Sequence, residues 1–535
     1  MLRGRSVGIA VDSEVTGRPP ARPASVRAVR VNGACLVGLS AERVTVEARF
    51  EGHDRPGTEL VLSGLPDPVI RESRGRLLCA LKENGLRLPP GVLHLNLVPA
   101  ARRKVGGMLD LSICLGAAAA CGHLDPRWLE GTLFVGELGI DGRLHAVPGG
   151  LAAGRAAVEA GLERLLAPHA TAREATHVAA LDCRGAGSLA EVVGHLSGAG
   201  PELSPEEPDG GSQAGTARAF DGPGLDQVRG QASAKRGLAL AALGGHGLLM
   251  SGPPGAGKTL LAQRLPGLLP PPTREERIEI TLARSAAGLW PGGLATRRPF
   301  RAPHHTTSHA GLVGGGSPIR PGEVSLAHGG VLFLDELPEF QRESLEALRE
   351  PLEAGQVTIG RAGQRLELPA RFQLVAAMNP CPCGYRGHPQ VPCRCSRPMV
   401  DRYRRRISGP LLDRIDLRLE LRPARLEELL GDPGEATGPT HEELAAAIAR
   451  GRERGLRRQG STTNAALDLG ALDELSPLEG EARRLVEAAA RRQPLSGRAL
   501  QALRRVARTV ADLEDEDRVR AAHVAEALAL RPAWA

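Results

Sequence analysis

The chain has 535 residues, of which 42% are apolar, and it carries a formal net charge of +7 with a pI near 9.1. One hydrophobic core seldom organises so long a chain, so we expect two to four domains. The sequence contains no run of eighteen or more apolar residues, which argues against a membrane-spanning helix and predicts no membrane partner.

The positive charge comes almost entirely from arginine, because the only lysines are Lys82, Lys104, Lys235 and Lys258. Such a balance is compatible with an acidic partner such as nucleic acid, and equally with a solvated basic surface. Five of the nine cysteines stand singly in apolar surroundings, at positions 35, 79, 114, 121 and 183. Scattered thiols of this kind are typical of a reduced, cytoplasmic protein without a disulfide framework.

Changes in composition divide the chain into five segments. Residues 1–30 are rich in arginine, proline and glycine, which predicts a disordered extension. Short β-like runs alternate with helical stretches over 31–195, as in a compact α/β domain. Residues 196–224 have the composition of a linker, 225–425 predict a longer α/β core, and 426–535 predict a helical domain.

A glycine-rich motif, GPPGAGKT, follows an apolar run and opens a helix at Lys258. It fits the pattern G-x-x-x-x-G-K-[ST], in which backbone N–H groups surround the phosphates of a nucleotide. We expect Lys258 to contact the β- and γ-phosphates of ATP and Thr259 to offer its hydroxyl to Mg²⁺. The predicted ATP-binding residues of this motif are Gly252, Pro253, Pro254, Gly255, Ala256, Gly257, Lys258 and Thr259.

A histidine-rich stretch, HHTTSH, contains His304, His305 and His309. The spacing of the last two resembles a metal site on a helix. The surrounding Gly/Pro-rich run has little helical character, so a loop is the favoured interpretation.

A second motif, GGVLFLDELPEF, supplies carboxylates farther along the chain. Its apolar residues, Val331 to Leu334, predict a buried parallel strand that ends at Asp335 and Glu336. Carboxylates at the carboxyl end of such a strand can face a neighbouring phosphate loop. We expect Asp335 to hold Mg²⁺ and Glu336 to polarise the attacking water.

The stretch GQVTIGRAGQRLEL predicts a β-hairpin whose strands alternate around the short turn GRAG. Arg361 at the tip and Arg365 on the return strand are placed to contact a phosphate backbone of DNA. A plain hairpin with solvated arginines is the alternative.

Three polar residues complete a set for phosphoryl transfer. Asn379 closes the apolar strand FQLVAAMNP, where it is placed to orient the lytic water. Arg414 in SGPLLDRIDL and Arg498 in PLSGRAL are candidates to neutralise charge on the γ-phosphate. Their order and spacing after the acidic pair distinguish them from the other arginines.

Four cysteines follow Asn379 directly, with the spacing C-x-C-x9-C-x-C, and His388 lies among them. Four soft ligands close a tetrahedral shell and leave no open position for catalysis, so structural zinc is favoured over a catalytic metal or disulfides. His388 is the reserve ligand. The zinc loop, residues 381–395, would then fix the connection between Asn379 and a predicted helix, VDRYRRRISGPLLDRID, that carries Arg414. The predicted zinc ligands are Cys381, Cys383, Cys393 and Cys395.

The P-loop, LFLDE, the strand-end asparagine, LLDRID and GRA, in this order, resemble an AAA+ ATPase. The phrases FRAPHHTTSHAGLVGGG and RPGEVSLAHGGVLFLDELPEF narrow the resemblance to the magnesium-chelatase-like ComM/YifB family. It implies an α/β protein with an N-terminal domain similar to the Lon-protease (S5-like) fold, a central AAA+ P-loop domain with a parallel sheet, and a C-terminal helical lid. Met108 stands where a Lon-type protease needs its serine, so we interpret the N-terminal domain as non-proteolytic.

The resemblance also implies partners and roles. Arg414 would be the finger that reaches the ATP of a neighbouring subunit, and Arg498 the sensor arginine of the lid, in a homo-oligomeric ring, most simply a hexamer. The histidine loop and the predicted hairpin would face the pore of that ring. The leading hypothesis is an ATP- and Mg²⁺-dependent motor that moves on single-stranded or branched DNA and promotes branch migration during natural transformation and recombination. The alternatives are a chelatase-type ATPase that remodels a partner protein for metal insertion, and a chaperone-like ring.

Overall fold

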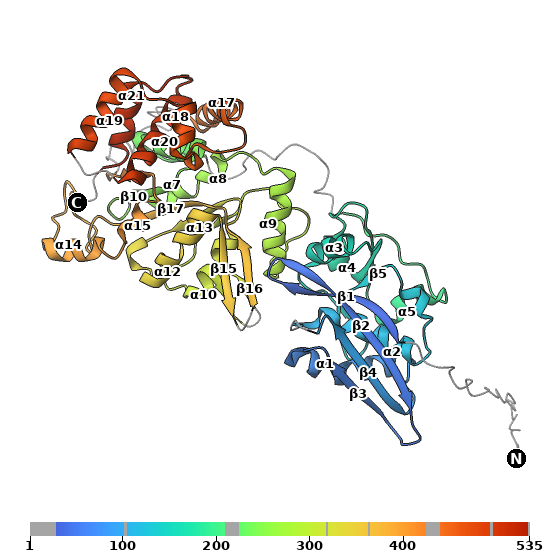
Figure 1. Ribbon diagram of the computed structural model, residues 1–535. Coiled ribbons are helices and arrows are strands. Elements are labelled where there is room, and N and C mark those ends of the chain that lie inside the picture. Colours follow the sequence, from blue (N-terminus) through green and yellow to red (C-terminus); the bar gives the residue numbers. More distant parts are fainter. Residues whose placement is uncertain are drawn as a thin grey trace, which may run out of the picture.

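The computed structural model describes residues 28–100, 104–208, 224–316, 319–361, 364–423, 439–492 and 496–532. Within these residues the chain forms an N-terminal α/β region, a central α/β region and a helical C-terminal region, which follow one another along an elongated molecule (Figure 1). The expected fold class is therefore confirmed. The predicted N-terminal extension lies almost wholly outside the described residues. Residues 209–223 of the predicted linker also lie outside them.

The N-terminal region is built on a seven-stranded mixed sheet with the order β3-β4-β2-β1-β5-β8-β9. Strands β1, β2 and β4 pair antiparallel, and the remaining pairs are parallel. The strands are β1 (Val29–Val37), β2 (Ser40–Gly52), β3 (Thr58–Ser63), β4 (Gly91–Val98), β5 (Thr132–Phe134), β8 (Arg164–Pro168) and β9 (Asp182–Ala186), with β6 (Glu137–Leu138) and β7 (Leu144–His145) forming a separate ribbon.

Five helices accompany this sheet: α1 (Pro68–Glu83), α2 (Asp110–Ala120), α3 (Gly150–Glu159), α4 (His169–Ala175) and α5 (Leu189–Ser197). Every residue of α2 is buried, because its sequence DLSICLGAAAA offers small and apolar side chains on all sides. Met108 is buried directly before α2, so its thioether is part of the core.

The central region contains five parallel strands in the order β11-β14-β17-β10-β18. Strands β10, β14 and β17 are apolar and almost wholly buried, as expected for a parallel sheet that is covered on both faces. Parallel pairing brings their carboxyl ends to one edge. The strands are β10 (Leu248–Ser251), β11 (Phe300–Arg301), β14 (Val331–Leu334), β17 (Gln373–Met378) and β18 (Leu417–Glu420).

The helices of the central region are mostly short, and two-residue strands β12 (Gly314–Gly315) and β13 (Arg320–Pro321) form a small ribbon among them. The helices are α6 (Ala232–Gly244), α7 (Lys258–Ala262), α8 (Leu265–Leu268), α9 (Arg274–Ala286), α10 (His309–Val313), α11 (Glu323–Leu326), α12 (Arg342–Ala347), α13 (Arg349–Ala354), α14 (Arg397–Arg404) and α15 (Gly409–Leu412).

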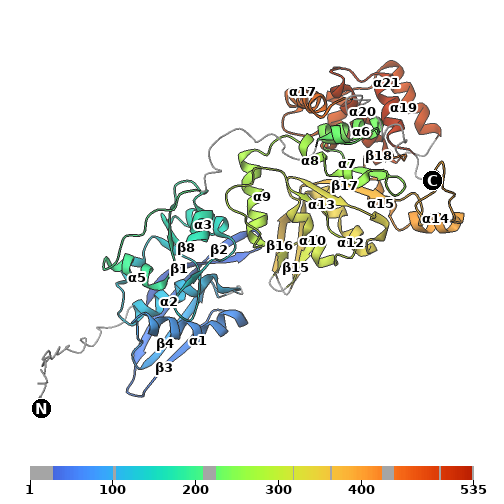
Figure 2. The ribbon, with the colours of Figure 1, turned by 180° about the vertical axis from the view of Figure 1, so that it is seen from behind.

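The predicted hairpin is present as β15 (Gln356–Arg361) and β16 (Gln364–Pro369), paired antiparallel. It lies beside the N-terminal region, as both views of the molecule show (Figures 1 and 2). Leu368 of β16 is buried with Leu39, which lies in the β1–β2 turn, and with Ala283 of α9. Gly38 in that turn has a φ of +65°, and a side chain there would approach Leu366 to 2.6 Å. The turn is therefore shaped to receive the hairpin.

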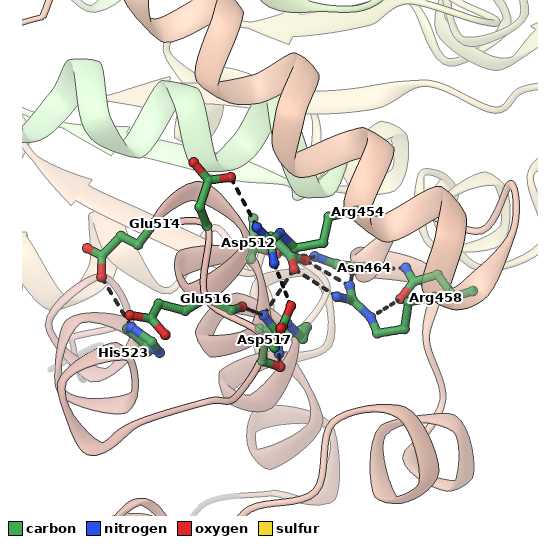
Figure 3. Close-up of polar contacts among 12 residues, drawn as sticks. Arg454, Arg458, Asn464, Asp512, Glu514, Glu516, Asp517 and His523 are labelled. Atoms are coloured by element: carbon green, nitrogen blue, oxygen red, sulfur yellow. Dashed lines mark hydrogen bonds and ion pairs between the residues drawn. The ribbon is translucent and has the colours of Figure 1, made fainter.

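The C-terminal region consists of α17 (His441–Gln459), α18 (Leu469–Leu475), α19 (Gly480–Arg492), α20 (Gly497–Leu513) and α21 (Ala521–Ala529). Helix α6 of the central region shares a core with α17 and α20. A buried polar network joins α17, α20 and the segment between α20 and α21 (Figure 3). Its centre is Asp512, which accepts hydrogen bonds from Arg458 at 2.8 Å and from Asn464 at 2.8 Å.

None of the helices in the described part of the chain combines the length and the apolar character that a bilayer crossing requires.

Candidate functional site

The glycine-rich loop lies at the carboxyl end of β10. Gly255 and Gly257 have φ values of +78° and +85°, which side chains rarely adopt, so both positions require glycine. Helix α7 begins directly after Gly257. The predicted order of strand, loop and helix is therefore present around residues 252–259.

The Lys258 side chain lies over this loop and reaches a second strand. Its Nζ donates hydrogen bonds to the carbonyl oxygens of Gly252 at 2.6 Å and Pro253 at 3.0 Å, and to Oδ1 of Asn379 at 3.0 Å. Burial lowers the pKa of Lys258, while the charges of Asp335 and Glu336 oppose that shift. The ammonium is thus a partly desolvated cation between the loop and the end of β17.

The acidic pair lies beside the same loop. Thr259 donates a hydrogen bond from Oγ1 to Oδ2 of Asp335 at 2.8 Å. The other Asp335 oxygen accepts the backbone N–H of Glu336 at 2.9 Å. Glu336 has a φ of +54°, which is unusual for a residue with a side chain and is often found at functional positions.

Lys258, Thr259, Asp335, Glu336 and Asn379 all line one cavity of about 390 Å³. The strand order explains their convergence, because β17 pairs with β14 on one side and β10 on the other. Side chains that follow these three strands meet at the same edge of the sheet. The cavity therefore combines a cation, two carboxylates, a hydroxyl and an amide next to a glycine-rich loop, which is a donor set suited to phosphate and a hard divalent cation.

His305 joins this site, although the sequence analysis assigned no chemistry to it. Its Nδ1 lies 3.3 Å from Oε2 of Glu336, and its ring lies 4.1 Å from the ring of His304, centroid to centroid. The histidine loop follows β11, which runs parallel to β14, so it leaves the sheet at the edge where Glu336 lies. The short strand β11, within the sequence PFRAP, is the local signal from which this placement could have been predicted. His304 and His305 lie in the expected loop, whereas His309 is the first residue of α10, where the loop prediction was wrong.

Arg414 and Arg498 do not line the cavity; they meet elsewhere, at Glu353 near the end of α13. The single helix predicted to carry Arg414 is divided into α14 and α15, and Arg414 follows α15. Arg414 donates to Glu353 at 2.6 Å and to the carbonyl oxygen of Pro410 at 2.7 Å. Arg498, in the first turn of α20, donates to the other oxygen of the same carboxylate. The two arginines therefore share one acid that no sequence pattern marked, and the side chain of Arg414 is 9% exposed whereas that of Arg498 is half-exposed.

The four cysteines of the predicted zinc loop come together in the structure. The sulfur of Cys381 lies 3.4 Å from that of Cys383 and 3.6 Å from that of Cys393, and all four ligand atoms lie within 4.8 Å of one another. A tetrahedron with metal–sulfur bonds of about 2.3 Å has edges of roughly 3.8 Å, so the cluster is close to the size of a tetrahedral metal site. Among the described residues, these four form the only such group.

The surroundings of the cluster favour a thiolate at Cys383. The backbone N–H groups of Tyr385 and Arg394 lower the pKa of Cys383 to about 6. Backbone hydrogen bonds also act to lower the pKa of Cys393 and Cys395, but desolvation and the neighbouring sulfurs together raise it above the ordinary value.

His388 is not part of the cluster, since its Nδ1 accepts the backbone N–H groups of Gln390 at 3.1 Å and Val391 at 3.0 Å. His388, predicted as the reserve ligand, therefore stabilises a turn of the zinc loop through its Nδ1.

The zinc loop also contacts the glycine-rich loop. Gly384 has a φ of +83°, and a side chain there would come within 2.7 Å of Pro254. This close approach requires glycine and brings the cysteine cluster next to the candidate nucleotide site.

Arg365, on the return strand of the hairpin, has a side chain that is 74% exposed and lies 3.5 Å from Glu367. The pair is solvated and weak, so the guanidinium is available to a partner. The side chain of Arg361 lies outside the described part of the structure.

Three family descriptions match successive parts of the chain. "Subunit ChlI of Mg-chelatase" matches residues 46–171, "Magnesium chelatase, subunit ChlI" matches 224–429, and "Magnesium chelatase, subunit ChlI C-terminal" matches 438–531. The candidate site lies within the second of these.

Similar proteins extend the comparison to nearly the full length. The chain is 39% identical to YifB of Escherichia coli over 510 residues, which cover 94% of this chain and 96% of that protein. It is 40% identical to competence protein ComM of Haemophilus influenzae over 504 residues, which cover 92% and 96% of the two chains. It is 26% identical to the magnesium-chelatase 67 kDa subunit of Heliobacterium mobile over 241 residues, which cover 39% and 34%.

Proposed function

The chain belongs to the magnesium-chelatase-like AAA+ family of YifB and ComM, whose members are ATPases that use ATP and Mg²⁺, and we propose that it is an ATP-hydrolysing ring motor that moves on DNA. The observation that carries the ATPase part is the convergence of five predicted groups on one cavity beside the glycine-rich loop. The finer proposal, branch migration on single-stranded or branched DNA during natural transformation and recombination, is supported by the printed name of the relative ComM.

Each group in the cavity has a role in this proposal. The phosphates of ATP replace the carbonyl acceptors that Lys258 now contacts, and the amides of the glycine-rich loop bind the same anions. Thr259 and Asp335 would hold Mg²⁺, because a hydroxyl and a carboxylate 2.8 Å apart present hard oxygen ligands to one point. When bound, the ion supplies charge neutralisation at the phosphates. Glu336 polarises the attacking water and Asn379 orients it.

Arg414 and Arg498 act on the ATP of a neighbouring copy in this proposal. Their shared partner Glu353 keeps them together, away from the cavity of their own chain. A ring, most simply a hexamer, brings that pair to the next cavity, where two guanidiniums neutralise charge on the γ-phosphate.

Zinc is the metal that the four cysteines fit best, because a closed set of four thiolates at tetrahedral spacing is typical of structural zinc. Its role here is to stiffen the connection from Asn379 to α14 and to support the glycine-rich loop through the contact between Gly384 and Pro254. Loss of the metal would therefore loosen both the connection from Asn379 to α14 and the support of the glycine-rich loop.

The β15–β16 hairpin contacts DNA through its phosphates in this proposal. Arg365 is exposed, and Arg361 occupies the last position of β15. Few aromatic residues are present, 2% of the chain, so electrostatic contacts to the backbone are favoured over base stacking.

The test is ATP hydrolysis by the full-length protein with and without single-stranded DNA and a four-way junction. We expect DNA to raise turnover and to bind with an affinity that falls steeply with salt. Replacing Arg365 with alanine should weaken that binding and leave hydrolysis without DNA unchanged. If wild-type protein at low salt, with ATP present, neither binds the two DNAs nor changes its turnover with them, the DNA proposal is wrong and the ATPase proposal is unaffected.

A chelatase-type ATPase is the second candidate, favoured by the similarity to the Heliobacterium magnesium-chelatase subunit over part of the chain. Such a ring would remodel a partner protein for metal insertion, and DNA would leave its turnover unchanged. The same assay separates the two.

A further inference from the structure

The segment from Arg386 to Arg406 is a strongly basic stretch whose arginines have no role in the function proposed above. Seven of its 21 residues are arginine and only one, Asp401, is acidic, whereas the whole chain has 68 basic residues among 535. The arginine content here thus exceeds what the general bias of the chain explains.

The fold displays this charge at one edge of the molecule. Helix α14 lies at the periphery of the central region, on the side away from the N-terminal region, in both views (Figures 1 and 2). Its residues Val400 and Tyr403 are buried, and Met399 is the one large apolar side chain that the helix exposes. Arg402 and Arg405 are exposed there. This arrangement suits a polyanion better than a lipid bilayer, which would require a free apolar face.

A cavity of about 620 Å³ lies beside α14. Four guanidiniums line it, those of Arg342, Arg402, Arg405 and Arg406, and Asp401 is the one carboxylate in its lining. Arg406 is paired with Glu339 at 2.7 Å. Two positive charges therefore remain in excess around the cavity.

That excess is available to a ligand. Within the described residues, the guanidinium groups of Arg402 and Arg405 have no ion pair or hydrogen bond with another protein group, although the backbone N–H of Arg405 donates to the carbonyl oxygen of Asp401. Arginine in this state binds phosphate oxygens through its planar fork of N–H donors. Two further exposed arginines, Arg386 and Arg394, lie within the zinc loop, and α14 begins two residues after that loop ends.

We propose that the surface formed by α14 and the zinc loop is a second nucleic-acid contact, which binds the phosphate backbone of DNA at Arg402 and Arg405. The proposal rests on the DNA motor described above. It adds a binding surface separate from the β15–β16 hairpin, at the opposite side of the central region. The ring would then hold DNA at two places, and the cysteine cluster would have a recognition role besides its structural one.

The test compares two double variants of the full-length protein that remove the same charge. R402Q/R405Q alters the proposed surface. R483Q/R491Q alters exposed arginines on α19, where both side chains lie near Glu487, and is the matched control. Binding of a fluorescein-labelled single strand and of a labelled four-way junction is measured by anisotropy over a series of salt concentrations.

R402Q/R405Q should weaken binding about tenfold at moderate salt and reduce the slope of log affinity against log salt by roughly 1.4 to 1.8, the value for two lost phosphate contacts. The control should change neither quantity by more than about twofold. Melting temperature and hydrolysis without DNA should stay at the wild-type values in both variants, because the substituted side chains are exposed.

Equal behaviour of the two double variants would overturn this inference. So would loss of ring assembly by R402Q/R405Q without DNA, since the surface would then contact another copy of the chain. Wild-type protein that binds no DNA would overturn both proposals. DNA binding that depends on Arg365 but not on Arg402 and Arg405 would overturn only this one.

Discussion

Substitution of Asp512 by alanine should destabilise the C-terminal helical region more than any exposed charge change. The carboxylate is 1% exposed and accepts from Arg458, Asn464 and the fully buried Arg508, the last at 3.0 Å (Figure 3). Burial lowers the pKa of Arg508, and the charge of Asp512 opposes that shift. Alanine at this position leaves a buried guanidinium with its counter-charge removed.

The cost follows from the burial of both partners. Removing one member of a buried ion pair costs about 3–5 kcal/mol, because the remaining charge loses its partner without regaining water. Arg508 keeps its hydrogen bonds to the carbonyl oxygens of Glu516 and Asp517, which favours the lower half of that range. Asp473 provides the matched control. It pairs with Arg504 at 2.6 Å but is 72% exposed, so its loss should cost less than about 1 kcal/mol.

Urea unfolding followed by circular dichroism measures the global effect, and hydrogen exchange of peptides from α17, α20 and α21 measures the local one. Asp512→Ala should speed exchange in these three helices and leave the N-terminal sheet unchanged. A loss of stability no larger than that of Asp473→Ala would show that the network does not stabilise the region, and the reasoning from burial would be wrong.

Four further predictions concern the candidate site. Glu336→Gln should bind ATP normally and hydrolyse it at least about a hundredfold more slowly, as measured by nucleotide titration and phosphate release; near-normal turnover would reject its assigned role. Arg414→Ala should bind ATP without hydrolysing it, and mixing it with Lys258→Ala should restore part of the activity, whereas no recovery would argue against a finger acting between subunits. Elemental analysis of freshly prepared, reduced protein should find zinc equimolar with the chain, and metal-free protein would contradict the cluster assignment. His305→Ala should lower kcat about tenfold with little change in KM, because Glu336 loses its partner. His305→Asn should recover part of the loss, because it keeps a hydrogen-bond donor near the position of Nδ1. An unchanged kcat in the alanine variant would show that the contact does not contribute to hydrolysis.

Local patterns in the sequence predicted the elements that carry the site. The strand, loop and helix around Lys258 follow from an apolar run, two glycines that need positive φ, and a helix-forming sequence. The strand before Asp335 follows from four buried apolar residues. The hairpin follows from alternation around a glycine-containing turn. In each case neighbouring residues contain the whole signal.

Contacts between distant segments were beyond the reach of these patterns. Glu353 binds Arg414 from 61 residues away and Arg498 from 145 residues away, and no local feature marks it among the other acids of α12 and α13. The pairing of His305 with Glu336 likewise depends on β11 lying next to β14. Tertiary packing, rather than propensity, decides which side chains meet in both cases.

The contact between the β1–β2 turn and β16 limits how the protein can be shortened. A chain that starts at the glycine-rich loop would lose Leu39 and uncover part of the buried Leu368, which Ala283 of α9 would still contact, and part of the half-buried Leu366. Full exposure of a buried leucine costs about 1.5–3 kcal/mol, so this partial exposure costs less. Those leucines lie on a two-stranded ribbon, and an uncovered apolar strand is prone to pair with another copy of itself. Fragments that lack the N-terminal region should therefore aggregate through the β15–β16 hairpin, which is also the element proposed to bind DNA. The N-terminal region thus protects the hairpin from self-association.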